Sequence, residues 1–148
     1  MIKVAENVWI GNSHDESQSN LQALKITGVL NVAQDLHSTR GWLHGIEYCQ
    51  VGLIDGPGNL LSAYCAAALA LDVLARRRPT LVCCHSAGRS LAVAIMYLNL
   101  VTYRGWDEWL EILHERIDCP LPQVHSAHKE AFGKINWKSL GKDMGIQV

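Results

Sequence analysis

Short apolar runs that alternate with longer helical patterns are the feature that most constrains this fold. Residues 8–10, 29–33, 48–53 and 80–83 read as strands, and their mostly uninterrupted apolar character is typical of strands buried on both faces. The segments between or after them have helical character: 13–24, an Ala/Leu-rich stretch from Asn59 to Arg78, 90–103, 106–117 and 123–135. Asn59 is a good N-cap for the second of these, and Pro79 stops it. The alternation predicts an α/β fold, a three-layer sandwich whose central, mainly parallel sheet is flanked by helices.

The length and charge of the chain narrow its class. A chain of 148 residues fits a single domain, which we expect to span 1–148 with 136–148 as a weakly patterned C-terminal tail. A net charge of −1 argues against a nucleic-acid or anionic-membrane partner. The longest apolar stretch, 61–75, is too short to span a bilayer. Five irregularly spaced cysteines without a signal peptide ahead of them predict a reduced, cytoplasmic protein, and we expect a monomer.

The segment 81–93, LVCCHSAGRSLAV, carries the chemical information. It predicts a strand ending at a cysteine, a short loop, and a helix opened by Arg89. Loop N–H groups and the helix dipole then converge on one anion, and the same donors stabilise a nucleophilic thiolate. Arg89 can grip two phosphate oxygens, and the Ser90 hydroxyl can help the sulfur to leave. The expected phosphate-binding residues are Cys84, His85, Ser86, Ala87, Gly88 and Arg89.

These residues resemble the protein tyrosine phosphatase superfamily, whose signature is Cys, five residues, and Arg followed by Ser or Thr. The resemblance is closest to the small dual-specificity phosphatases and extends to 7–12, 29–33 and 92–98. It implies the cysteine phosphatase fold and no metal or organic cofactor. In that family a general-acid Asp lies about thirty residues before the nucleophile. Asp55, in a turn 28 positions before Cys83, matches it, and Asp35 is its competitor.

Because two cysteines are adjacent at the end of the strand, the sequence must also indicate which of them is the nucleophile. Cys83 leaves five residues before Arg89 and Cys84 leaves four. Because a phosphate-binding loop tolerates a deletion poorly, spacing predicts Cys83 as the nucleophile. Cys84 is then a packed loop residue or a partner that traps an oxidised Cys83. A zinc site at Cys83, Cys84 and His85 is excluded, because adjacent residues rarely converge on one tetrahedral ion.

The reaction implied is hydrolysis of a phosphomonoester. Cys83 attacks phosphorus, Asp55 protonates the leaving oxygen, and water hydrolyses the phosphocysteine with Asp55 as base. The loop has no permanent cation besides Arg89, which favours singly phosphorylated protein or peptide substrates, phosphotyrosine ahead of phosphoserine or phosphothreonine. Val82 and Ser86 stand where the family usually has His and Gly. The alternative is therefore a phosphate-binding pseudophosphatase with little or no turnover.

Overall fold

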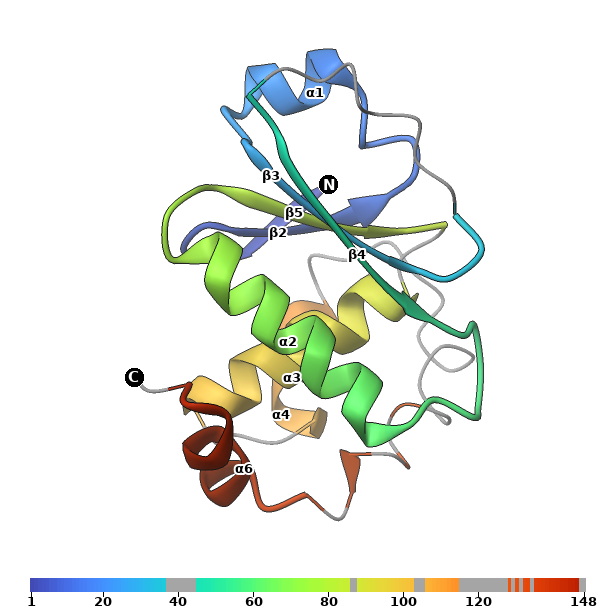
Figure 1. Ribbon diagram of the computed structural model, residues 1–148, viewed down its shortest axis with the longest axis vertical. Coiled ribbons are helices and arrows are strands. Elements are labelled where there is room, and N and C mark those ends of the chain that lie inside the picture. Colours follow the sequence, from blue (N-terminus) through green and yellow to red (C-terminus); the bar gives the residue numbers. More distant parts are fainter. Residues whose placement is uncertain are drawn as a thin grey trace.

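The computed structural model describes residues 1–36, 45–85, 88–102, 106–114, 128, 130, 132–133 and 135–146. Strands and helices alternate along the chain, as the apolar pattern predicts (Figure 1). Most of the predicted helix at 123–135 and most of the loop at 34–46 lie outside the described residues. The strands are β1 (Ile2–Ala5), β2 (Val8–Asn12), β3 (Gly28–Ala33), β4 (Glu47–Leu53) and β5 (Thr80–Cys84). The helices are α1 (Gln18–Ala23), α2 (Leu61–Ala75), α3 (Gly88–Thr102), α4 (Trp106–His114) and α6 (Trp137–Met144).

The five strands form one mixed sheet in the order β1-β2-β5-β3-β4. β5 pairs in parallel with both β2 and β3, β4 adds in parallel beside β3, and β1 is antiparallel at the other edge. The carboxyl ends of β2 to β5 therefore share one edge of the sheet. In open α/β sheets, ligands bind outside that edge. The predicted mainly parallel α/β sandwich is confirmed.

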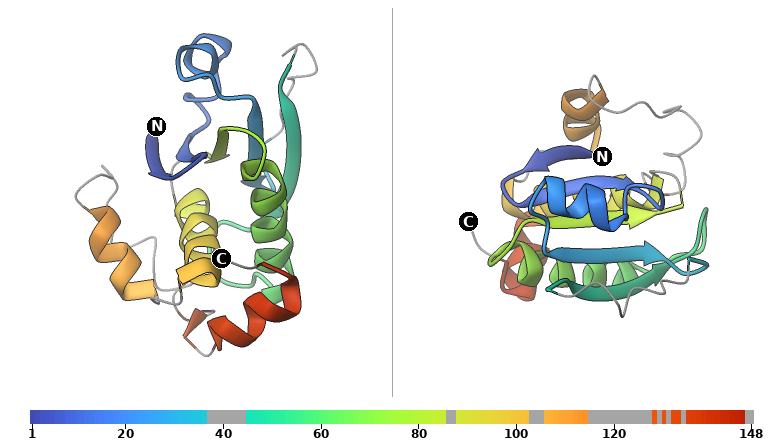
Figure 2. Two further views of the ribbon diagram at one scale, coloured as in Figure 1. Left: turned by 90° about the vertical axis from the view of Figure 1, so that its left-hand side faces the viewer. Right: turned by 90° about the horizontal axis from the view of Figure 1, so that it is seen from above.

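The sheet separates two apolar clusters of unequal size. The larger lies under α2 and α3, which pack side by side on one face, and α4 and α6 pack against α3 (Figures 1 and 2). The smaller lies on the α1 side of the sheet and includes Leu21 and Val29. Alternate residues of β5 enter different clusters: Val82 and Cys84 join the larger, while Leu81 and Cys83 join the smaller. This alternation decides where each cysteine points.

Two local predictions differ from the structure. Asn59 does not cap α2: the N-cap is Leu60, which makes no side-chain capping bond, and the Asn59 side chain binds the preceding turn instead. The predicted tail contains α6. Asn136 caps it by accepting a hydrogen bond from the Ser139 amide, and Gly145, at φ 72°, ends it in the left-handed conformation that favours glycine. Within the described ranges, no helix is both long and apolar enough to cross a bilayer.

Candidate active site

Arg89 lies in the first turn of α3 with its side chain only 3% exposed. Its Nη1 donates to Asp35 Oδ1 at 2.7 Å and to the backbone oxygen of Leu53 at 2.9 Å. Asp35 follows β3, and Leu53 is the last residue of β4. The guanidinium is therefore held at the carboxyl edge of the sheet by two neighbouring strand ends. A buried arginine is an expensive group to desolvate, and this placement suits it to bind an anion.

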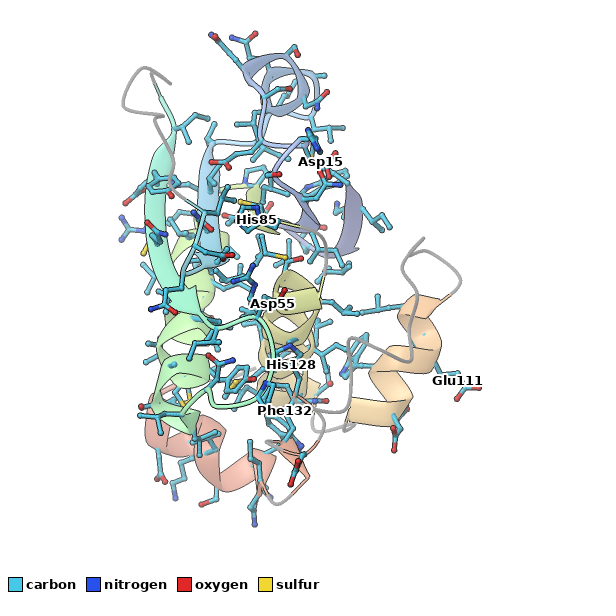
Figure 3. All side chains as sticks on the ribbon, turned by 90° about the vertical axis from the view of Figure 1, so that its right-hand side faces the viewer. Asp15, Asp55, His85, Glu111, His128 and Phe132 are labelled. Carbon is cyan, nitrogen blue, oxygen red and sulfur yellow. The ribbon has the colours of Figure 1, made fainter. Side chains whose placement is uncertain are left out.

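The other end of the loop meets the same carboxylate. His85 Nε2 lies 3.4 Å from Asp35 Oδ2, so Asp35 bridges the residues that flank the loop. In Figure 3, which looks toward the carboxyl edge of the sheet, His85 and Asp55 both lie near the middle of the view. Gly88 begins α3, as the predicted loop requires. Ser86 and Ala87, predicted to bind phosphate, lie outside the described residues.

Cys84 is the cysteine that contacts Ser90. Its Sγ lies 3.6 Å from Ser90 Oγ, and Ser90 Oγ donates to the backbone oxygen of Gly11 at 3.3 Å. Both side chains are buried, and Cys84 belongs to the same apolar cluster as Leu53, whose carbonyl receives Arg89. A hydroxyl beside a sulfur can turn to donate to the thiolate form. The structure therefore places the expected partner of the leaving sulfur beside Cys84.

Cys83 points into the smaller cluster. Its Sγ lies 3.6 Å from Glu16 Oε2, with the thiol as donor and the carboxylate as acceptor. Glu16 is itself only 3% exposed. The Cys83 thiol therefore lies on the opposite side of β5 from the cluster that contains Leu53, whose carbonyl receives Arg89. Spacing predicts Cys83 as the nucleophile, whereas these contacts favour Cys84.

Asp55 sits in an exposed turn between β4 and α2, held by Asn59. Asn59 Oδ1 accepts from the Ile54 amide at 2.7 Å, and Nδ2 donates to the Ile54 and Gly56 carbonyls at 2.8 and 3.3 Å. These bonds fix the backbone on both sides of Asp55. Gly56 and Gly58 adopt φ of 123° and 107°, a region that favours glycine, so the Asp-Gly-Pro-Gly turn matches its sequence.

Asp35 is held electrostatically by Arg89. The hydrogen bond from the Arg89 guanidinium holds the pKa of Asp35 below its usual value of 3.8, and the nearby charge of His85 acts in the same direction. Asp35 is already engaged by Arg89, whereas Asp55 makes no such ion pair among the residues that the structure describes, so Asp55 stays the candidate general acid.

Three features of the site were not predicted from the sequence. Nothing in the pattern indicated the contact of Glu16 with Cys83, because Glu16 lies in a polar segment expected to start a helix. The hydrogen bonds from Asn59 to Ile54 and Gly56 were not predicted, because asparagine at that position is also typical of a helix N-cap. The bridge made by Asp35 depends on long-range pairing of β3 with β5. Among the described residues, no group of three or more His, Cys, Asp or Glu side chains could hold a metal ion.

A comparison with known proteins identifies one that is similar to this chain in sequence. No protein-family model matches the chain. Human dual specificity protein phosphatase 22 is 27% identical over 128 residues, which cover 84% of this chain and 68% of the relative. This match agrees with the fold and with the site residues described above. The chain is similar in sequence to a human dual-specificity phosphatase.

Solved phosphatase structures share the fold of this chain. The crystal structure of DUSP15 superimposes with a TM-score of 0.80 at 22% identity, covering 98% of this chain and 94% of that one. The core catalytic domain of the PP-IP phosphatase SIW14 from S. cerevisiae, in complex with citrate, gives a TM-score of 0.73 at 14% identity, with coverage of 97% and 90%. At these identities the likeness establishes the three-layer cysteine phosphatase architecture.

Proposed function

We propose that this protein is a cysteine-dependent phosphatase that hydrolyses phosphomonoesters through a phosphocysteine intermediate. The observation that carries the proposal is the buried Arg89 guanidinium, held at the carboxyl edge of the sheet next to the strand end that carries Cys84. Support also comes from the match to a human dual specificity protein phosphatase. Arg89 and the loop N–H groups would bind the phosphoryl group and stabilise its charge as it transfers.

Cys84 is the nucleophile that the contacts support best. Its thiolate attacks phosphorus, the P–O bond to the leaving group breaks, and Asp55 gives its proton to the leaving oxygen. Asp55, now a carboxylate, takes a proton from water as that water attacks the phosphocysteine. The P–S bond then breaks, and the Ser90 hydroxyl turns from Gly11 to the departing sulfur. Spacing assigns the same steps to Cys83, so the two assignments predict opposite effects of substitution.

Phosphotyrosine in a protein or peptide is the proposed substrate, with phosphoserine and phosphothreonine slower because an alkoxide is the poorer leaving group. Arg89 is the one permanent cation between Cys84 and Ser90, so the loop does not offer the several charges that a polyphosphate needs. SIW14, which shares the fold, is a PP-IP phosphatase, so substrates with several phosphates are the ones to compare. We further propose a single domain over 1–148, acting as a cytoplasmic monomer without a nucleic-acid or membrane partner.

Hydrolysis of p-nitrophenyl phosphate and of a phosphotyrosine peptide, with and without vanadate, tests the proposal. We expect vanadate-sensitive release of phosphate from both. The pseudophosphatase alternative, motivated by Val82 and Ser86, predicts that tungstate binds without turnover. A kcat/KM for a phosphoinositide or a 5′-triphosphorylated RNA about tenfold above that for the peptide would overturn the substrate assignment.

A further inference from the structure

Asp35 occupies an unusual place for an acidic residue. It lies beside the predicted phosphate site, where a negative charge repels the substrate, yet both of its carboxylate oxygens face residues of that site. Oδ1 lies 2.7 Å from Arg89 Nη1, and Oδ2 lies 3.4 Å from His85 Nε2. Its side chain is 62% exposed, so burial does not force these contacts. Some other contribution of this carboxylate must therefore offset its repulsion of a bound anion.

The hydrogen bonds of Arg89 supply that reason. The Nη1 group has two hydrogens, and its two acceptors here are Asp35 Oδ1 and the backbone oxygen of Leu53. A guanidinium has five N–H donors arranged in a rigid plane. With Nη1 held in this way, the edge formed by Nε and Nη2 is the fork left for a pair of phosphate oxygens. Fixing one nitrogen at two points also fixes the plane of the group.

We propose that Asp35 is a positioning residue that orients Arg89, so that its Nε/Nη2 edge is presented to the transferring phosphoryl group. Asp35 itself does not touch the substrate. Its second oxygen lies 3.4 Å from His85 Nε2, so the same carboxylate contacts residues at both ends of the loop. This inference rests on the proposed function, because it assigns Arg89 to the phosphoryl group.

Two other roles for Asp35 lead to different results. If the only effect of Asp35 were to repel anions from the site, removing its charge would strengthen anion binding in both Asp35→Asn and Asp35→Ala. If it were the general acid, Asp35→Asn would lose as much activity as Asp35→Ala, since neither can give a proton. A positioning role depends on an acceptor for Nη1, which the amide oxygen of asparagine still provides and alanine does not.

The test compares Asp35→Asn and Asp35→Ala by the kinetics of p-nitrophenyl phosphate hydrolysis and by calorimetric binding of tungstate. We expect Asp35→Ala to lose roughly 10- to 100-fold in kcat, the scale of a misplaced catalytic group. Asp35→Asn should stay within about threefold of the wild type, because it keeps the hydrogen bond and loses only its charge assistance. Asp72→Asn is the matched control, since Asp72 makes a 2.7 Å ion pair with Arg76 on α2, at the opposite end of that helix from the Asp55 turn.

Each outcome decides the inference. Equal losses in Asp35→Asn and Asp35→Ala, or tighter tungstate binding in both, would overturn it. If the wild type binds tungstate without turnover, the proposed function fails, but the inference still predicts weaker binding in Asp35→Ala than in Asp35→Asn. Loss of folding in Asp35→Ala would show in its melting temperature, and Asp35→Ser, which is smaller and polar, then replaces it.

Discussion

Cys84 Sγ lies 3.6 Å from Ser90 Oγ, whereas the sulfur of the preceding cysteine points to the other side of the same strand. The contact joins the last residue of β5 to the first turn of α3 across the loop. Because a hydroxyl stabilises a neighbouring thiolate by donating to it, this pair is the reason that the proposed mechanism assigns the leaving sulfur to Cys84.

Ser90→Ala should slow the hydrolysis of the phosphocysteine. Without the hydroxyl, the departing thiolate of Cys84 loses a charge-assisted hydrogen bond, and we expect kcat to fall by roughly 10- to 100-fold. Rapid mixing with p-nitrophenyl phosphate should show a burst of nitrophenolate before the slow steady state. Ser90→Thr keeps a hydroxyl and should recover most of the rate. A slower but burst-free Ser90→Ala enzyme would place the role of Ser90 in the first step.

Asp55→Asn should slow hydrolysis of phosphotyrosine peptides by roughly 10²- to 10⁴-fold, the usual contribution of general acid catalysis. The loss should shrink for aryl phosphates with very good leaving groups, since these leave without protonation. A plot of log kcat/KM against leaving-group pKa measures this directly. Wild-type rates for Asp55→Asn on the peptide would show that Asp55 is not the general acid.

Asn59→Ala should act through Asp55. Removing the three hydrogen bonds that hold Ile54 and Gly56 frees the turn and displaces the acid. We expect about a tenfold loss on peptide substrates and less on good leaving groups, the same dependence as in Asp55→Asn. Asn136→Ala, which removes the cap of α6, is the matched control and should leave kcat unchanged. An Asn59→Ala loss that is equal for all leaving groups would mean a general loosening of the site.

The Asp35–Arg89 pair should contribute a pH-dependent part of the stability. The pKa of Asp35 is lowered in the folded protein by Arg89, so the contribution is present above its unfolded value of 3.8 and is lost as pH falls through the lower, folded value. Thermal melts of wild type and Asp35→Asn should therefore differ at neutral pH and converge in strong acid. Because Asp35 is mostly exposed, the difference should be small. A difference in melting temperature between the two proteins that grows as the pH falls would contradict this prediction.

The parallel sheet and the strand and helix on either side of the predicted anion loop were predictable because their signals are local. Apolar runs mark buried strands, and the segment from Leu81 to Val93 contains its own strand, loop and helix. The direction of each cysteine was not predictable, because β5 is apolar on both faces and its periodicity shows no inward or outward side. The number of residues between a cysteine and Arg89 gives the length of the loop, but it does not show on which face of the sheet the side chain of that cysteine lies.

Helix α6 could have been predicted from its sequence. Asn136 and Gly145 are standard capping residues, and Trp137, Leu140 and Met144 recur at helical spacing along the side that packs on the larger cluster. The predominance of polar residues in 136–148 hid this pattern. Asn59 is the opposite case, since its capping propensity predicted one partner while the turn around Asp55 offered better-placed backbone groups.

Parallel measurement of p-nitrophenyl phosphate hydrolysis by wild type, Cys83→Ser and Cys84→Ser tests the central claim most directly. The contact of Cys84 with Ser90 predicts that Cys84→Ser abolishes turnover while still binding tungstate, and that Cys83→Ser keeps a substantial part of the wild-type rate. Loop spacing predicts the reverse. An inactive Cys83→Ser beside an active Cys84→Ser, both folded by their melting temperatures, would contradict the account and assign the nucleophile to Cys83.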